Sequence, residues 1–312
     1  MKFVIVSPRQ QWGGAIVLHA LCKYLSENGH DAKIFYCGLT HYDERKKVRF
    51  WLQMLKCGAK EAVKFILACI GNERFKQIYM HPPVRGCKRK FLPKVDADTI
   101  VVYPESIYGN FLHAEKKVRW LLYHHPFTEN PQAAFGEDAL FIAYREVFND
   151  EKLNPAGHMV TISYFDLETY RQYNFGERSG NCYIIRKGKN RPDLPKEFDG
   201  PVLDDLPEKR IVEAFNRCEY CISYDTQTAY SSIAALCGCV SVVVPEPGMG
   251  KLDYLAPEED SSGVAYGFSE EELQFARETR HRVKELFEED NQKSKLAAQQ
   301  FAKICKAYFY EK

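Results

Sequence analysis

Residues 1–37, MKFVIVSPRQQWGGAIVLHALCKYLSENGHDAKIFYC, contain the pattern that decides the fold. Residues 2–7 and 31–36 are short, mostly apolar runs, which are typical of buried strands. Between them, apolar residues recur at helical spacing until Asn28 and Gly29 end the predicted helix. A strand, a helix and a second strand in this order form a right-handed βαβ unit. The sequence therefore predicts a doubly wound α/β domain at its amino-terminal end.

The loop before this helix, RQQWGGAIV (9–17), lacks the Gly-x-Gly-x-x-Gly fingerprint of dinucleotide-binding proteins. The second strand is followed by Cys37 and Gly38, where such proteins place an acidic residue against the ribose. The sequence therefore disfavours a nicotinamide enzyme. Gly13 and Gly14 leave two interpretations open. Their backbone N–H groups could approach a phosphate or a sugar hydroxyl, or the two glycines could serve only a tight turn.

Composition limits the class of protein. The chain has 312 residues, of which 45% are hydrophobic and 27% are charged, so it can bury a large core. Its 43 Lys and Arg against 42 Asp and Glu give no overall attraction to nucleic acid, and we expect no nucleic-acid partner. Eleven cysteines lie scattered in apolar segments, which is typical of reduced thiols in a cytoplasmic protein. The longest apolar runs are far shorter than the roughly 18 residues of a membrane-spanning helix.

One segment departs from this charge balance. Residues 45–94 carry fourteen Lys and Arg against two acids, a local net charge of +12 in a chain of net charge +1. Apolar residues at helical spacing between Phe50 and Ile70 predict basic amphipathic helices. Such helices suit an anionic membrane surface or a phosphate-bearing acceptor, and an ordinary helical pair with a solvated Lys-rich face is the alternative. We therefore expect a cytoplasmic protein, either free or peripheral at the inner face of the cell membrane.

Two predicted strands in the middle of the chain end in polar side chains. Residues 99–103 stop shortly before Glu105, and residues 119–123 stop before a His-His-Pro sequence that contains His125. The carboxyl ends of parallel strands lie along one edge of a sheet, where α/β enzymes keep their chemistry. Glu105 and His125 are therefore the candidate catalytic residues, as acid or base. A buried histidine with a structural hydrogen bond is the alternative for His125.

The sequence gives no support to a metal site. Asp96-Ala97-Asp98 matches an Asp-x-Asp motif that binds a metal and a nucleotide, but it precedes its strand instead of following one. We therefore predict a turn at these residues. No pair of Cys or His residues has zinc-ligand spacing together with a matching second pair.

The second half of the chain predicts another sheet. Residues 159–163 have the composition of a last strand of the first sheet, and residues 174–181 form a polar hinge. Residues 181–185 then open the new sheet. Directly after this strand, Arg186 and Lys187 begin the run RKGK, whose three cations stand where an anionic ligand would bind.

Residues 221–248, CISYDTQTAYSSIAALCGCVSVVVPEPG, are the most informative block. They predict a strand over 221–224, a polar turn, a helix of small residues over 229–236 and a strand over 240–244. Hydroxyl and free N–H groups at the start of this helix would form a cradle for a phosphate. A plain helix cap with close helix–sheet packing is the alternative.

The stretch YDTQTAYSSIAALCGC (224–239), followed by PEPG, resembles the donor-site block of GT-B glycosyltransferases. It is most similar to the branch that contains the rhamnan-extending rhamnosyltransferases of bacterial surface polysaccharides. The sequences VYPE (102–105), GN (109–110), RWLL (119–122) and RKG (186–188) resemble the same branch. The likeness therefore covers most of the chain.

The resemblance implies an α/β fold of the GT-B type, with two Rossmann-like domains that face each other across a cleft. The first domain, on the acceptor side, would comprise residues 1–176, with the basic helical insertion at 45–94. The nucleotide-sugar-binding domain would comprise residues 177–290. A final helix within residues 291–312 would cross back to the first domain.

The resemblance also implies roles for single residues. Arg186 and Lys187 would contact the donor diphosphate, and His125 would lie near the transferred sugar. The implied donor-binding residues are Gly13, Gly14, Arg186, Lys187, Tyr224, Asp225, Thr228 and Ser231. One position departs from the pattern: the larger retaining group has Glu-x7-Glu, whereas this chain has Asp225 and Ile233. The resemblance therefore does not decide between retention and inversion of the anomeric configuration.

The implied activity is that of a hexosyltransferase that moves a sugar from a nucleotide diphosphate sugar to a saccharide or lipid-linked acceptor in surface glycan biosynthesis. It would need neither a metal nor a cofactor besides its donor, because cations and a helix N-terminus stabilise the departing diphosphate. If the reaction inverts, Glu105 or His125 would be the base. A GT-B-fold nucleotide-sugar epimerase and a non-catalytic sugar-nucleotide-binding subunit are the alternatives.

Overall fold

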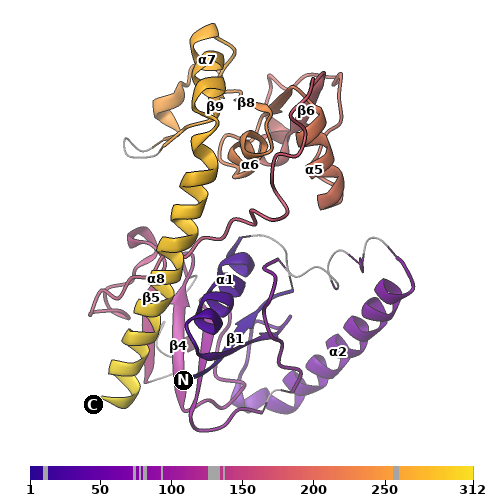
Figure 1. Ribbon diagram of the computed structural model, residues 1–312. Coiled ribbons are helices and arrows are strands. Elements are labelled where there is room, and N and C mark those ends of the chain that lie inside the picture. The colour runs from indigo at the N-terminus through magenta and orange to yellow at the C-terminus, as the bar shows by residue number, and fades with distance from the viewer. Residues whose placement is uncertain are drawn as a thin grey trace. The chain divides into compact units, whose positions relative to one another are not determined.

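The structure is a computed structural model that describes residues 1–9, 13–72, 75–76, 79, 83–92, 94–125, 134–135, 138–255 and 260–311. The chain divides into two compact units, one of Met1–Tyr164 with Asp290–Lys312 and one of Phe165–Glu289. Figure 1 shows strands with helices beside them in each unit. The domain limits predicted at residues 176 and 290 stay predictions, as does the cleft between two facing domains.

Each unit is built on a parallel sheet. The first sheet has the strand order β2-β1-β3-β4-β5, and the second has the order β6-β7-β8-β9, with every neighbouring pair parallel. The strands are β1 (Lys2–Ser7), β2 (Asp31–Tyr36), β3 (Thr99–Pro104), β4 (Lys116–Leu121), β5 (Ala139–Ala143), β6 (Asn181–Ile184), β7 (Tyr220–Ser223), β8 (Val240–Val243) and β9 (Val264–Tyr266). Two parallel sheets in one chain confirm the predicted α/β fold class.

The described helices lie between strands or follow the last strand, β9. They are α1 (Gly14–Glu27), α2 (Lys47–Cys69), α5 (Glu208–Arg217), α6 (Tyr230–Leu236), α7 (Glu270–Thr279) and α8 (Arg282–Tyr310), with 3-10 turns η1 (Glu44–Lys46), η2 (Glu146–Phe148), η3 (Arg186–Asn190) and η4 (Lys251–Asp253). The 29-residue helix α8 begins in the second unit, and its part from Asp290 onward belongs to the first. Among the described residues, no helix combines the length and the hydropathy that a membrane crossing requires.

Side chains of the first sheet alternate between two buried faces. Phe3 of β1 lies in one core cluster with residues of α1 and with Phe301 of α8. Val4, the next residue along the strand, lies in the other cluster, to which α2 contributes Phe50. This alternation follows from the period of two in a strand. A strand buried on both faces explains why residues 2–7 are continuously apolar.

Two strands predicted in the first unit, at residues 119–123 and 159–163, are wrong in position. β4 begins and ends earlier than residues 119–123, at Lys116 and Leu121, and β5 (Ala139–Ala143) was not predicted. Residues 159–163 make only a single bridge to the sheet, between Met159 and Ala143. Beyond that bridge, the Ser163 N–H donates to the Ser294 hydroxyl of α8 at 2.9 Å. A side chain from a distant helix thus takes the place of a strand partner.

Candidate active site

Glu105 directly follows β3 and connects the carboxyl ends of two neighbouring strands. Its Oε2 accepts a hydrogen bond from the backbone N–H of Leu122, at 2.9 Å, just beyond β4. Burial raises the pKa of the Glu105 carboxyl, and the backbone N–H donors and the charge of His125 only partly offset this effect. A carboxyl with a raised pKa exchanges protons closer to neutral pH, which suits an acid or base.

His125 follows β4 and is held by a carboxylate. Its Nε2 lies 2.9 Å from Oδ2 of Asp150, and both side chains are largely buried. The second oxygen of Asp150 accepts hydrogen bonds from the backbone N–H groups of Lys152 and Leu153. Burial acts to raise the pKa of the Asp150 carboxyl, but the hydrogen bond with His125 and then the two backbone hydrogen bonds outweigh burial, so the pKa is lowered. The Asp150 carboxylate thereby fixes the orientation of the His125 ring through Nε2.

The structure therefore brings Glu105 and His125 to the same edge of the first sheet, close enough for the charge of His125 to affect the Glu105 pKa. Asp150 was missed in the sequence. It lies beyond β5, and because that strand was not recognised, nothing placed Asp150 at the same edge. The pattern ALFIA, followed by an acid within ten residues, is the signal that could have found it.

Gly13 and Gly14 satisfy local requirements of the first turn of α1. Gly13 has a φ of 57°, in the left-handed region that favours glycine. A Cβ on Gly14 would lie 3.2 Å from Cδ1 of Leu122. Residues 10–12 of the same loop lie outside the described residues. Both glycines thus have a structural reason, and donor binding by them stays a prediction.

In the second unit, the cationic turn η3 lies against the end of β7. A Cβ on Gly188 would lie 2.2 Å from the carbonyl oxygen of Tyr224, so only glycine allows the two backbones this contact. The Arg186 guanidinium lies 4.3 Å from the ring centroid of Tyr230, and the backbone N–H of Arg186 donates to Asp204. The structure thus brings Arg186 to the start of α6, and the exposed Lys187 follows it.

Among the predicted donor residues near this contact, Asp225 and Thr228 lie in the turn before α6, and Ser231 lies in the first turn of α6. Asp225 is buried, and its Oδ1 accepts from the backbone N–H of Gln227 at 3.1 Å. The Thr228 hydroxyl accepts from the N–H of Tyr230 at 3.3 Å, so both side chains close the turn. The buried hydroxyl of Ser231 has no hydrogen-bond partner among the described residues.

Arg191 is a further cation that the sequence did not single out. Its guanidinium donates to the backbone carbonyls of Tyr224, Val244 and Pro245 and pairs with Asp193. It therefore joins the ends of β7 and β8 and supports the turn that carries Arg186. Arg191 is the last residue of the cationic run RKGKNR (186–191), and this position in the run is the signal that could have identified it.

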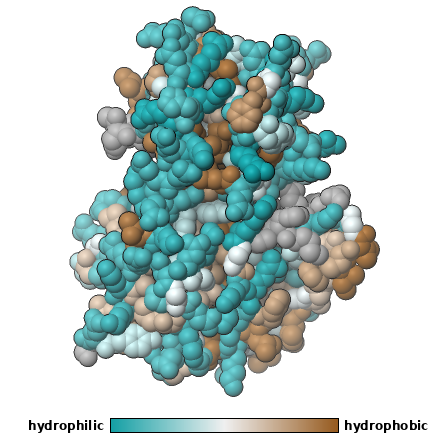
Figure 2. Space-filling model, in the orientation of Figure 1, coloured by the Kyte–Doolittle hydropathy of each residue, from teal (hydrophilic) through white to brown (hydrophobic). Residues whose placement is uncertain are grey.

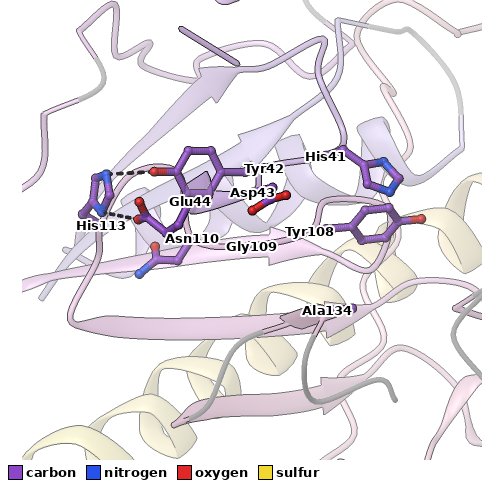
Figure 3. A pocket seen from close by; sticks show the side chains of 9 residues that line it. All are labelled: His41, Tyr42, Asp43, Glu44, Tyr108, Gly109, Asn110, His113 and Ala134. Atoms are coloured by element: carbon purple, nitrogen blue, oxygen red, sulfur yellow. Dashed lines mark hydrogen bonds and ion pairs between the residues drawn. The ribbon is translucent and has the colours of Figure 1, made fainter. Parts of the chain in front are cut away.

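A hollow of about 440 Å³ lies in the first unit, between the loop after β2 and the loop after β3 (Figure 3). It is lined by His41, Tyr42, Asp43, Glu44, Tyr108, Gly109, Asn110, His113 and Ala134. The ring of His113 lies 3.3 Å from the Tyr42 hydroxyl and 3.5 Å from the Glu44 carboxylate. The sequence pointed to this loop only through Gly109 and Asn110.

One buried cation shapes the loop that lines this hollow. The Arg119 side chain, from β4, is fully buried and donates to the carbonyls of Ile107, Gly109 and Phe135. Burial lowers the pKa of its guanidinium to about 10, so Arg119 stays charged at neutral pH. Arg119, the first residue of the RWLL sequence that resembles the glycosyltransferase branch, therefore has a structural role.

Asp96 and Asp98 lie at the opposite edge of the first sheet. Asp96 accepts from Lys2 Nζ at 2.8 Å and from the Thr99 hydroxyl, at the amino-terminal ends of β1 and β3. The Thr99 N–H donates to the Asp96 carbonyl, which confirms the predicted turn. Among the described residues, no three His, Cys, Asp or Glu side chains are grouped so that they could hold a metal ion.

No family model and no curated protein sequence match this chain. Solved structures match it over nearly its whole length. An alpha-glucosyltransferase (AGT) in complex with UDP is 12% identical with a TM-score of 0.40, covering 97% of this chain and 99% of that chain. The glycosyltransferase VinC in complex with DTDP is 13% identical with a TM-score of 0.31, covering 99% and 96%. With TM-scores below 0.5, these likenesses support no inference on activity.

Proposed function

We propose that the protein is a glycosyltransferase of the GT-B type that moves a sugar from a nucleotide diphosphate sugar to a saccharide or lipid-linked acceptor. The observation that carries this proposal is the His125–Asp150 pair beside Glu105, at the edge of a parallel sheet where ligands bind. The second sheet offers Arg186 and Lys187 at the corresponding edge. The donor-site resemblance supports the same division of roles, and the rhamnosyl branch stays a prediction.

In this proposal, His125 is the base of an inverting transfer. The His125 imidazole accepts the proton of the acceptor hydroxyl as the hydroxyl oxygen attacks the anomeric carbon, and the bond from that carbon to the diphosphate oxygen breaks. Asp150 stabilises the imidazolium that forms, because its carboxylate lies 2.9 Å from Nε2. Glu105 is the alternative base, and its raised pKa is compatible with that role.

The departing nucleotide diphosphate needs positive charge and hydrogen-bond donors. Arg186 and Lys187 supply the charge, and the hydroxyls of Thr228 and Ser231 supply donors at the start of α6. The contact of Gly188 with Tyr224 holds the cationic turn beside that helix. We expect these groups to make a divalent ion unnecessary for transfer.

The hollow in the first unit suits the acceptor. Saccharides stack on aromatic rings and hydrogen-bond to carboxylates, and the hollow offers Tyr108 together with Asp43 and Glu44. The His41 ring packs edge-on against Tyr108, with 4.0 Å between ring centroids, and orients this wall. We place the acceptor saccharide at these side chains.

A transfer assay tests the proposal. Labelled nucleotide diphosphate sugars are incubated with the protein, with and without saccharide and lipid-linked acceptors, in buffer and in chelator. We expect a glycosylated acceptor of inverted configuration, formed equally in both buffers. A sugar isomer formed without acceptor would indicate the epimerase, and binding without any turnover would indicate the non-catalytic subunit.

A further inference from the structure

Helix α2 has two apolar faces, and only one of them packs against the protein. Its buried residues are Phe50 and Ala68, and Phe50 contacts the rings of Tyr42 and Phe111. On the opposite side, large apolar residues recur at spacings of three, four and eight. They are Val48, Leu52, Leu55, Val63, Ile66 and, directly after the helix, Ile70, and each is between 54% and 74% exposed.

These residues form one continuous surface. With 3.6 residues per turn, they fall within a sector about 100° wide, centred roughly opposite to Phe50. Ala59 and Ala62, which are exposed, fill the same sector. We call these eight residues the apolar stripe. Figure 2 shows the hydrophobic colour gathered over α2, at the right of the view. Contiguous exposed apolar surface of this kind marks an interaction site.

Cations border the apolar stripe. Arg49, Lys56 and Lys60 are exposed on one flank, and none of them makes an ion pair among the described residues. The helix contains one acid, Glu61, on the packed side. Its carboxylate is bound by Lys64 at 2.8 Å, by Arg9 at 3.2 Å and by the hydroxyl of Tyr79. The solvent side of α2 therefore presents apolar residues and positive charge without negative charge.

We propose that the apolar stripe of α2 docks onto an anionic lipid bilayer, with the helix lying in the plane of the headgroups. A helix of this length and pattern places its apolar side among the acyl chains and its cations among anionic headgroups. A second copy of the chain is a poorer partner. A two-fold contact pairs the same surface with itself, and it would bring Arg49, Lys56 and Lys60 against their own copies. This docking is independent of the proposed transfer reaction.

Vesicle sedimentation tests the docking without any assay of transfer. The full chain is mixed with vesicles of phosphatidylcholine alone or with phosphatidylglycerol, at low and high salt. We expect binding to the anionic vesicles at low salt, weaker binding at high salt, and little binding to the neutral vesicles. Absence of binding to anionic vesicles at low salt, or equal binding to both kinds, overturns the proposal.

Matched variants locate the surface. Leu55→Asp and Ile66→Asp should each abolish sedimentation, whereas Leu252→Asp, at an 86% exposed residue of the second unit, should not. The double variant Lys56→Ala and Lys60→Ala should weaken the partition constant by about 30-fold, since each cation near an anionic surface counts for about one kcal/mol. The exposed Lys209 and Lys284 are the matched control pair.

Size-exclusion chromatography with circular dichroism on the same variants distinguishes the other outcomes. The changed side chains are exposed, so we expect unaltered spectra and melting temperatures. A wild-type dimer that Leu55→Asp dissociates, without vesicle binding, would make the apolar stripe an interface between copies and overturn the proposal. Equal loss of binding in Leu252→Asp and Leu55→Asp would also overturn it, because the effect would then come from net charge alone.

Discussion

The carboxyl edges of the two sheets carry opposite chemistry. Beyond β3, β4 and β5, the first unit places Glu105, His125 and Asp150, which are groups that accept or hold protons. Beyond β6, the second unit places Arg186 and Lys187, which are groups suited to bind an anion. The same architecture thus offers a proton acceptor in one unit and an anion site in the other. Parallel sheets supply the edge, and the loops decide the chemistry.

The largest expected effect lies in the first unit. Replacing His125 by Ala should lower turnover by about 10²- to 10⁴-fold, because a general base contributes that much, while the affinity for the donor stays unchanged. The neighbouring His124, which is exposed, gives the matched control His124→Ala. Steady-state kinetics and donor titration on both variants make the measurement. Normal turnover of His125→Ala with loss in Glu105→Gln would move the base to Glu105.

The next effect lies in the second unit and concerns binding. Lys187→Ala should weaken donor affinity by about 1.5 to 3 kcal/mol, or roughly 10- to 150-fold, if the contact to the diphosphate is charge-assisted. Lys189→Ala, in the same turn, is the control and should change affinity little. Titration calorimetry in buffer and in chelator provides the comparison. An unchanged affinity for Lys187→Ala, or a donor affinity lost in chelator, would contradict the proposed anion site.

Substitutions at two glycines test how tightly the carboxyl edges of the two sheets are packed. Gly188→Ala should lower the free energy of unfolding by about 1 to 3 kcal/mol, because the new Cβ would meet the Tyr224 carbonyl oxygen at 2.2 Å. Gly14→Ala should change it by less than about 1 kcal/mol, since its nearest neighbour is the end of the Leu122 side chain, at 3.2 Å. Urea denaturation of both variants checks this order. Equal losses would show that the first edge is as tightly packed as the second.

The smallest expected effect is on the pH dependence of stability, to which the carboxyls of Glu105 and Asp150 contribute with opposite sign. The raised pKa of Glu105 means that the folded state binds more protons than the unfolded state between the two pKa values, so Glu105 makes stability fall as pH rises through that window. The lowered pKa of Asp150 contributes stability above its unfolded pKa, and this contribution is lost as pH falls through the folded pKa.

Urea denaturation across acidic and neutral pH checks both signs. Relative to the wild type, Glu105→Gln should gain stability as pH rises, and Asp150→Asn should lose stability as pH rises. Two variants with the same pH dependence would show that these carboxyls do not lie in the different environments described for them.

Local pattern predicted the bounds of the first two strands. β1 has the predicted bounds, Lys2–Ser7, because it lies inside the parallel sheet and is mostly apolar along its length. β2, at the edge of the sheet, has the predicted bounds Asp31–Tyr36, because its short, mostly apolar run follows the end of the helix in βαβ order. The turn at Asp96 was also predicted from local pattern, because the polar Asp-x-Asp motif precedes its strand instead of following one. Residues 159–163 have the composition of a strand, but pattern alone did not reveal that their backbone pairs elsewhere.

The sequence by itself determined two α/β sheets and that Glu105, His125 and Arg186 follow strands, because hydrophobic periodicity and chain order are local properties. Only the tertiary structure decided that Asp150 holds His125, that Gly188 touches Tyr224, and that the apolar stripe of α2 faces solvent. The first two features are contacts between residues far apart in the chain, and the third is the absence of such contacts on one side of a helix. Such contacts depend on how strands and helices pack, and the spacing of residues along one element does not encode them.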